Sequence, residues 1–426
     1  MAAEDPGGPP PPPTDQAWAI HGQATFVDQV HTAFTSPYRG ANSLAPYASG
    51  RETFDATLFA GLRPWRGAEL WVNPEIDQGF GLSNTLGVAG FPSGEAYKVG
   101  KAKPYFRLQR LFLRQTINLS GASDRVEPDL NQLAGHQSDN RLVITLGKFG
   151  VTDMFDTSRY AHDPKHDFLN WGVIDAGTFD YAADAWGYSA GAVIEWYQGA
   201  WTLRAGAFDL SDVPNSEKLD PKFGQFQLIG ELERRFTVAG QPGSAKLSGF
   251  VTRGRMGRYD QAVALGLATG SPAKTALVRR YGGRGGVSAN LSQQVARDLG
   301  AFLRAGVAGG AVEPYEFADI DATVSGGLSL SGARWGRSGD TLALAGEING
   351  ISKAHQSYLA AGGVGILVGD GRLPHYGLEA ILETYYDIAV GRSLHLAADY
   401  QFVNNPAYNR DRGPVSIFAA RIHTQF

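Results

Sequence analysis

The chain repeats one pattern from end to end: a strand-sized segment that alternates apolar and polar side chains, a connection, and the same again. Successive side chains of a β-strand point to opposite faces, so each segment has one apolar and one polar face. Sixteen such segments predict strands near 17–30, 52–62, 67–75, 105–119, 140–149, 185–197, 200–210, 224–236, 244–256, 280–294, 298–310, 321–333, 340–350, 378–390, 392–404 and 414–426.

The connections alternate in length. Those after even-numbered segments are short, such as RPWR, QGA, TVAGQPG and RWGRSG, whereas those after odd-numbered segments are longer, including 31–51, 76–104, 150–184, 257–279 and 351–377. Residues 120–139 are the exception, because they form a long connection after the fourth segment, where the alternation predicts a short one. Tight turns on the periplasmic side and long extracellular loops are typical of antiparallel outer-membrane barrels, and sixteen strands leave an aqueous channel. We therefore predict an all-β protein, a 16-stranded antiparallel transmembrane β-barrel with long extracellular loops, some folded into the pore.

The two faces of the segments fit lipid and water. In AWGYSAGAVIEWYQ the residues Trp186, Tyr188, Ile194 and Trp196 share one face as an apolar band with aromatic ends, while Glu195 lies on the other. A soluble core could not repeatedly bury unpaired carboxylates, but a water-filled lumen can hold them. By the same alternation, we expect Phe426 to face lipid at the periplasmic rim of the closing strand.

Composition excludes several other classes of protein. A net charge of −4 gives no basic field for nucleic acid, and the absence of cysteine excludes disulfides and thiolate chemistry. No apolar run reaches the roughly 18–20 residues of a membrane helix. The start, MAAEDPGGPPPPPTDQ, has no secretory signal pattern, so we expect either an internal protein or a processed form with an added Met. Residues 1–16 are predicted to be a flexible, proline-rich periplasmic tail, and 17–426 the barrel.

Strand alternation also predicts the inward face. Both charge signs occur on it, so no strong charge selection is expected; Arg and carboxylate groups with neighbouring aromatic rings suit a neutral polyhydroxyl solute. Most of these side chains are equally expected of any solvated lumen. The predicted pore-lining residues are Arg110, Arg114, Glu69, Trp71, Glu75, Asp77, Arg204, Glu231, Arg304, Glu347, Asp399 and Arg421.

The connection before the sixth segment is rich in Asp and aromatic residues. An exposed loop would not be expected to keep so many aromatic side chains, so we predict that it folds into or against the barrel and narrows it. Packing and solute contact are equally consistent with this composition. Its candidate site residues are Asp163, Asp167, Trp171, Asp180 and Tyr181.

Motifs for other chemistry are weak. HDPKH spaces His162 and His166 as metal ligands could be, but Pro164 disfavours the helix that would bring the two rings together. Paired carboxylates on one strand, such as Glu231 and Glu233, are expected of a polar lumen without glycosidase activity. No nucleophile and base can be paired, so we predict no enzyme, no metal and no cofactor.

Several extended stretches resemble the carbohydrate-selective porins of the OprB family. They are RETFDATLFAGLRPWRGAELWVNPEIDQGFGLS, FDTSRYAHDPKHDFLNWGVIDAGTFDYAADAWGYSAGA, LETYYDIAVGRSLHLAADYQFVNNP and VSIFAARIHTQF. The resemblance runs from about Trp18 to Phe426. It implies a 16-stranded barrel in a Gram-negative-type outer membrane that passes monosaccharides such as glucose by facilitated diffusion, with inward-folded loops and a constriction of Arg and carboxylate groups.

Other functions stay open at this stage. A porin of broader selectivity, for organic acids or other small polar solutes, is the nearest alternative, and a structural or enzymatic outer-membrane barrel is the alternative of another class. Energised transporters have about 22 strands and a plug domain, which this chain is too short to supply. The expected partners are the outer-membrane bilayer and carbohydrate solutes, with no nucleic acid. A monomer and a homotrimer are both compatible with the sequence, as is a periplasmic contact through the tail.

Overall fold

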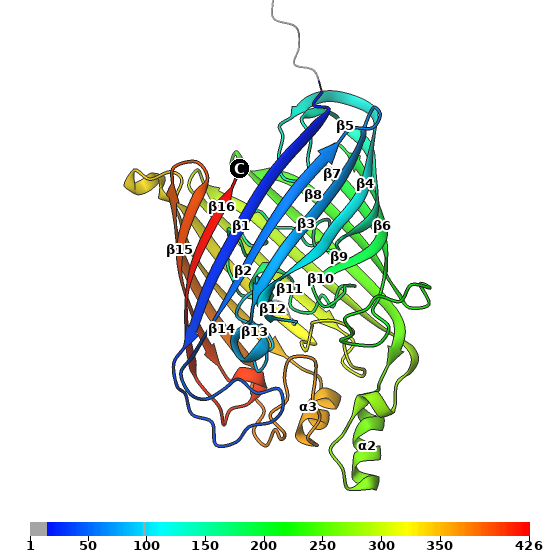
Figure 1. The fold of residues 1–426 in the computed structure, drawn as a ribbon, viewed down its shortest axis with the longest axis vertical. Helices are drawn as coiled ribbons and strands as arrows, with labels where there is room; N and C mark the ends of the chain where they lie inside the picture. The colour runs from blue at the N-terminus through cyan, green and yellow to red at the C-terminus, as the bar shows by residue number, and fades with distance from the viewer. Residues whose placement is uncertain (1–14, 97–98) are drawn as a thin grey trace, which may run out of the picture.

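A computed structural model describes residues 15–96 and 99–426 of the chain, and within them sixteen strands form one closed barrel (Figure 1). The strands are β1 (Trp18–His31), β2 (Ser49–Leu62), β3 (Ala68–Gly79), β4 (Lys101–Val126), β5 (Gly135–Gly150), β6 (Tyr188–Gln198), β7 (Trp201–Asp209), β8 (Phe226–Val238), β9 (Gln241–Met256), β10 (Arg280–Ala296), β11 (Leu299–Ala308), β12 (Ala322–Ser331), β13 (Thr341–Gly350), β14 (Glu379–Val390), β15 (Leu394–Asn404) and β16 (Val415–Gln425).

Every strand pairs antiparallel with its neighbours in the sequence, and β1 pairs with β16 to close the barrel. The predicted fold class is therefore confirmed, with each of the sixteen predicted segments overlapping one strand. Closure matters because an unpaired strand edge in lipid would leave backbone N–H and C=O groups without hydrogen bonds.

The two rims of the barrel differ in the length of the connections between their strands. Residues 63–67, 199–200, 239–240, 297–298 and 391–393 make short turns at the upper rim of Figure 1, where the C-terminus also lies. The long connections gather at the lower rim. They carry the helices α2 (Tyr259–Thr269) and α3 (Lys353–Ala360), and the short helix α1 (Trp171–Ile174) lies in the connection between β5 and β6. Single 3₁₀ turns occupy Leu82–Asn84, Thr275–Leu277, Gly332–Trp335 and Pro406–Tyr408.

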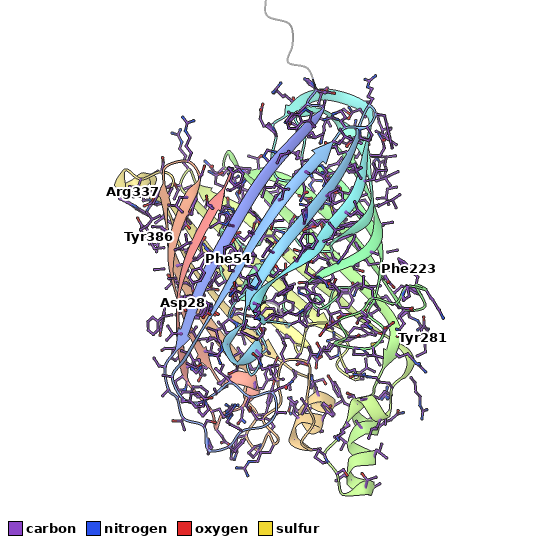
Figure 2. The ribbon with its side chains drawn as sticks, viewed as in Figure 1. Asp28, Phe54, Phe223, Tyr281, Arg337 and Tyr386 are labelled. Carbon is purple, nitrogen blue, oxygen red and sulfur yellow. The ribbon has the colours of Figure 1, made fainter. Side chains whose placement is uncertain are left out.

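Side chains alternate between an apolar outside and a polar inside. Along β6 and β7, Ile194 and Leu203 are 45% and 49% exposed on the outer surface, whereas Glu195 and Arg204 are buried. Phe54 and Tyr281 likewise lie on the outside (Figure 2). This arrangement is that of a barrel whose outer band meets hydrocarbon and whose interior is wet.

Five tryptophans mark the short-turn rim from outside. All five are exposed and lie at strand ends or turns on that rim; they are Trp18, Trp65, Trp196, Trp201 and Trp335. The indole of Trp335 donates a hydrogen bond to the hydroxyl of Tyr386 (3.0 Å), and Figure 2 shows Tyr386 near Arg337 at this rim. Amphipathic aromatic rings favour the lipid–water interface, so these residues form an aromatic girdle.

The prediction that Trp186 and Tyr188 face lipid is wrong. Trp186 is buried, where its indole donates to the Tyr105 hydroxyl (2.9 Å) and the Arg107 guanidinium lies 3.4 Å from its ring. Tyr188 lies 4.9 Å from the guanidinium of Arg110 and lines an internal cavity. Strand alternation misplaces Trp186 because β6 begins only at Tyr188, so Trp186 belongs to the preceding loop; Tyr188 is the first residue of the strand, where the loop joins it.

The long exceptional connection is also shorter than expected. We predicted a connection over 120–139, but β4 continues to Val126 and β5 starts at Gly135, which leaves residues 127–134 as the turn. β4 is the longest strand, and its hairpin with β5 projects beyond the short-turn rim (Figure 1). Polar residues such as Ser123, paired with Ser138, continue the strand ladder where the hydrophobic alternation has already ended.

Phe426 lies on the outer surface at the seam between β16 and β1, and is 74% exposed. Its backbone N–H donates to the carbonyl of Gly22 (2.9 Å), and its ring covers Gly22, where a Cβ would lie 2.4 Å from Cζ. Glycine is therefore required here to let the aromatic ring lie flat on the strand. Among the described residues, no helix is long and apolar enough to cross a membrane.

A single charged residue on the outer face tests whether that face contacts lipid. Leu247 is 61% exposed on the outer face near the middle of β9, so Leu247→Arg should lower the free energy of unfolding in lipid vesicles by about 2–4 kcal/mol. The same substitution at Thr116, which lines an internal cavity, is the control and should cost far less. Equal losses in denaturant titrations of both variants would contradict the assignment of the two faces.

Candidate functional site

The connection of residues 151–187 between β5 and β6 is held inside the barrel by arginines of distant strands. Arg304 on β11 is fully buried and donates to the carbonyls of Val173 (2.7 Å) and Ala161 (2.8 Å). Arg421 on β16 donates to the carbonyls of Pro164 (2.6 Å) and Asp167 among others. Each guanidinium therefore satisfies backbone groups of the loop that would otherwise be buried without partners.

Carboxylates and one amide complete the anchoring of this loop. Glu383 accepts hydrogen bonds from the backbone N–H groups of Leu169 (2.5 Å) and Asn170, and the Asn170 side chain caps α1 and donates to Gln401 (3.1 Å). The loop residues 168–186 are all buried as a result.

Asp180 joins the loop to a second connection. Its carboxylate accepts from the backbone N–H groups of Tyr315 (2.6 Å), Glu316 (2.9 Å) and Phe317 (3.1 Å), which lie between β11 and β12. It also pairs with the fully buried guanidinium of Arg284 (3.2 Å). Asp180 is thus a structural bridge between two inward loops.

A cavity of about 280 Å³ remains where the loop meets the barrel wall. Arg110 on β4 makes a two-pronged ion pair with Asp153 (2.7 and 2.8 Å), and Lys165 of the loop bridges Asp55 (2.8 Å) and Glu95 (2.7 Å). Glu75, which accepts from the Thr57 hydroxyl, also lines the cavity, as do Asp163 and Asp175. The cavity therefore has charged walls of both signs, with carboxylates in the majority.

Aromatic rings form the other part of this wall. Trp171 is stacked on Phe91, with ring centres 5.2 Å apart, and Tyr181 packs on Phe317 at 5.0 Å. Tyr188 lies beside Arg110. Flat apolar rings next to fixed charges are the combination that sugars bind, since a pyranose has apolar ring faces and polar edges.

A second cavity of about 580 Å³ adjoins the first one. The two share Leu130, Asn131, Asp153 and His162 as lining residues. Its far wall carries Arg114, Arg141 and Arg204. Arg204 pairs with three carboxylates at 2.8 Å each, those of Glu195, Glu231 and Glu233, so its charge is fully compensated.

A third cavity, also of about 580 Å³, lies among the long loops at the opposite end of the barrel. Tyr259 of α2 and Tyr358 of α3 lie on its wall with ring centres 4.8 Å apart, beside Lys274 and the ion pair of Arg279 with Glu313 (2.7 Å). It is a mainly apolar cavity with aromatic walls and charged groups at its edge.

Two loop carboxyls have strongly raised pKa values. Burial, together with the nearby Asp156 carboxylate, raises the pKa of Asp175 to about 8 against the opposing effect of Arg304. Burial raises the pKa of Asp167 to about 6, although backbone N–H groups donate to its carboxylate. For Asp153, burial acts in the same direction, but Arg110 outweighs it and the pKa lies below its ordinary value.

The predicted residues divide by their surroundings. The residues Arg110, Glu75, Asp163, Trp171 and Tyr181 line the first cavity, and Arg114 and Arg204 the second. The predicted site residues that line neither the first nor the second cavity are Glu69, Trp71, Asp77, Glu231, Arg304, Glu347, Asp399, Arg421, Asp167 and Asp180. Trp71, for instance, packs its ring over Gly61 and donates to Glu69 (3.0 Å). Solute contact by any of these residues stays a prediction.

Sequence reasoning missed Lys165, Glu95 and Asn131. Lys165 lies within HDPKH, where the two histidines drew attention to metal binding instead. Its partners Asp55 and Glu95 come from residues far apart in sequence, and no local pattern predicts that pairing. Within residues 15–96 and 99–426, no group of three His, Asp or Glu side chains is arranged to hold a metal ion.

Comparison with known proteins places this architecture in a family. The family model described as "Carbohydrate-selective porin, OprB family" matches residues 41–426. Among solved structures, Pseudomonas putida OprB superposes with a TM-score of 0.70 at 15% identity, covering 96% of this chain and 94% of that one. The outer membrane channel DcaP of Acinetobacter baumannii gives 0.51 at 10% identity, covering 96% and 97%.

No curated protein matches the chain. The two structural likenesses support the barrel fold, and the family match spans nearly the whole barrel. The chain therefore belongs to the OprB family of carbohydrate-selective porins and is an outer-membrane channel.

Proposed function

We propose that this channel gives passive, facilitated diffusion of carbohydrates, and of monosaccharides such as glucose in particular, across the outer membrane. The observation that carries the proposal is the cavity of about 280 Å³, in which the Arg110–Asp153 and Lys165–Asp55 ion pairs lie beside the rings of Trp171 and Tyr188. Its volume is at the small end of sites for small molecules, which favours one sugar ring over two.

Charge pairing supports a neutral solute. Arg110 and Lys165 both have carboxylate partners within 3 Å, so neither cation is left uncompensated to attract an anion. Their remaining N–H groups and the carboxylate lone pairs can still make charge-assisted hydrogen bonds to hydroxyls. The surplus of carboxylates disfavours organic acids, which are the solutes of the nearest alternative. Channels select by the diameter and hydrogen-bonding groups of their lining, and no reacting group is required for transport.

The proposal is tested by the swelling of liposomes that contain the purified protein. Glucose influx should exceed that of an amino acid and an organic acid of similar size, and a disaccharide should enter more slowly. Rates that follow solute size alone would replace the proposal with a general diffusion porin. Absence of swelling from correctly folded protein, judged by its heat-dependent electrophoretic mobility, would favour a closed structural barrel.

Replacing Arg110 and Arg114 together with Ala should weaken glucose binding without reducing assembly. A hydrogen bond to a charged group is worth about 1.5–3 kcal/mol, so the half-saturating glucose concentration for influx should rise by about tenfold to a hundredfold. Loss of both cations should also make the channel more cation-selective. Arg234→Ala is the matched control, because Arg234 lies against Trp201 at the rim and lines neither cavity. Unchanged saturation in the folded double variant would remove both arginines from the sugar path.

Ion selectivity should depend on pH through Asp175. Its raised pKa of about 8 means that the carboxyl is neutral at pH 6 and negative at pH 9, so the cation-to-anion permeability ratio should rise between these values. Reversal potentials across planar bilayers in a KCl gradient measure this ratio. Asp175→Asn keeps the shape and removes the titration, so its ratio should not rise near pH 8. A rise of the same size in the variant would assign the titration to another group.

A further inference from the structure

The turn of residues 127–134 between β4 and β5 folds back into the lumen at the short-turn rim. Asp129 and Gln132 exchange backbone hydrogen bonds of 3.1 Å, so Leu130 and Asn131 form its two-residue tip. Asn131 has φ = 54°, in the left-handed region that Asn tolerates better than most residues. The tip is therefore a tight and well-defined turn.

The tip is fixed to the inner barrel wall. The guanidinium of Arg114 donates to the carbonyl of Asn131 (2.7 Å), and the amide of Asn73 donates to its side-chain oxygen (2.9 Å). A little further on, the N–H of Leu133 points at the carboxylate of Glu69 (3.4 Å). These partners are inward-facing groups of β3 and β4, so the tip lies inside the barrel.

The far end of the turn is tied down by the segment that precedes β1. Gln16 and Ala134 exchange hydrogen bonds of 2.9 Å, from the Gln16 N–H to the Ala134 carbonyl and from the Ala134 N–H to the Gln16 side chain. Arg63 donates to the carbonyls of both residues (2.8 and 3.0 Å), and Asp15 lies 3.1 Å from the ring of His136. Both ends of the turn thus have partners in other parts of the chain.

The tip also lies on the walls of both inner cavities. Leu130 and Asn131 belong to the walls of both, together with Asp153 and His162 of the inward loop. Leu130 is an apolar side chain among charged ones, and it is partly buried against the hydrophobic cluster that includes Trp171. The inward loop and the turn therefore border the same two cavities.

We infer that the 127–134 turn is a second constriction element, which sets the upper size of solute that can leave the channel on the periplasmic side. Leu130 is the residue that limits the width, while Arg114, Asn73 and the Gln16–Arg63 contacts hold the turn in the lumen. The inference rests on the proposed function only in requiring a conducting, water-filled passage.

The absence of cysteine in the chain allows a direct test. Leu130→Cys, which has the smaller side chain, should conduct at least as well as the parent, and reaction with a bulky methanethiosulfonate reagent should lower its single-channel conductance by at least about half, because a narrow segment dominates pore resistance. The ratio of disaccharide to monosaccharide influx in liposomes should fall as well. Asp124→Cys is the matched control: Asp124 is exposed on the same hairpin and lines no inner cavity, so its labelling should leave conductance unchanged.

The outcomes separate the two proposals. A labelled Leu130→Cys protein, verified by mass, that conducts as before would overturn the inference, and so would a folded variant that does not react at all, because a residue of the passage must be reachable from water. If the unlabelled variant and the parent both fail to conduct, the proposed function itself is wrong.

Discussion

The structure depends on one constraint: in hydrocarbon, every backbone N–H and C=O of a strand must be hydrogen-bonded to a neighbouring strand. The pairing of β1 with β16 meets it by closing the sheet. Closure at sixteen strands then creates a second demand, because the interior is too wide for strand side chains to fill. The inward loop of residues 151–187 and the turn of residues 127–134 occupy this space.

Loops inside a barrel carry backbone groups that need partners, and the interior arginines supply many of them. Arg304 and Arg421 donate to loop carbonyls, and Arg284 pairs with the Asp180 carboxylate that in turn binds loop N–H groups. A charged residue on the inward face can therefore be a loop anchor, as Arg304 and Arg421 are. Arg110 differs because its ion pair with Asp153 faces a cavity.

This distinction marks how far the sequence could predict the protein. The strands follow from an alternation that is local, and all sixteen were found from it together with the parity of loop length. Many side chains that meet in the lumen come from parts of the chain that are far apart in sequence: Lys165 reaches Asp55 across 110 positions, and Arg304 reaches Ala161 across 143. No periodicity encodes such contacts. The error at Trp186 is of another kind, because the strand alternation was extended to residues that precede the start of β6.

The same geometry explains why selectivity in such a channel would depend on few residues. Two cavities of about 580 Å³ lie toward the two ends, and the cavity of about 280 Å³ lies where the inward loop meets the wall. Channels select by the diameter and hydrogen-bonding groups of their lining, so in the proposed function the residues around the smallest cavity carry the selection. Arg110 on β4, Lys165 and Trp171 of the inward loop, and Leu130 of the turn all line that cavity. Size discrimination and hydrogen-bond discrimination can therefore change independently, the first through the 127–134 turn and the second through the ion pairs.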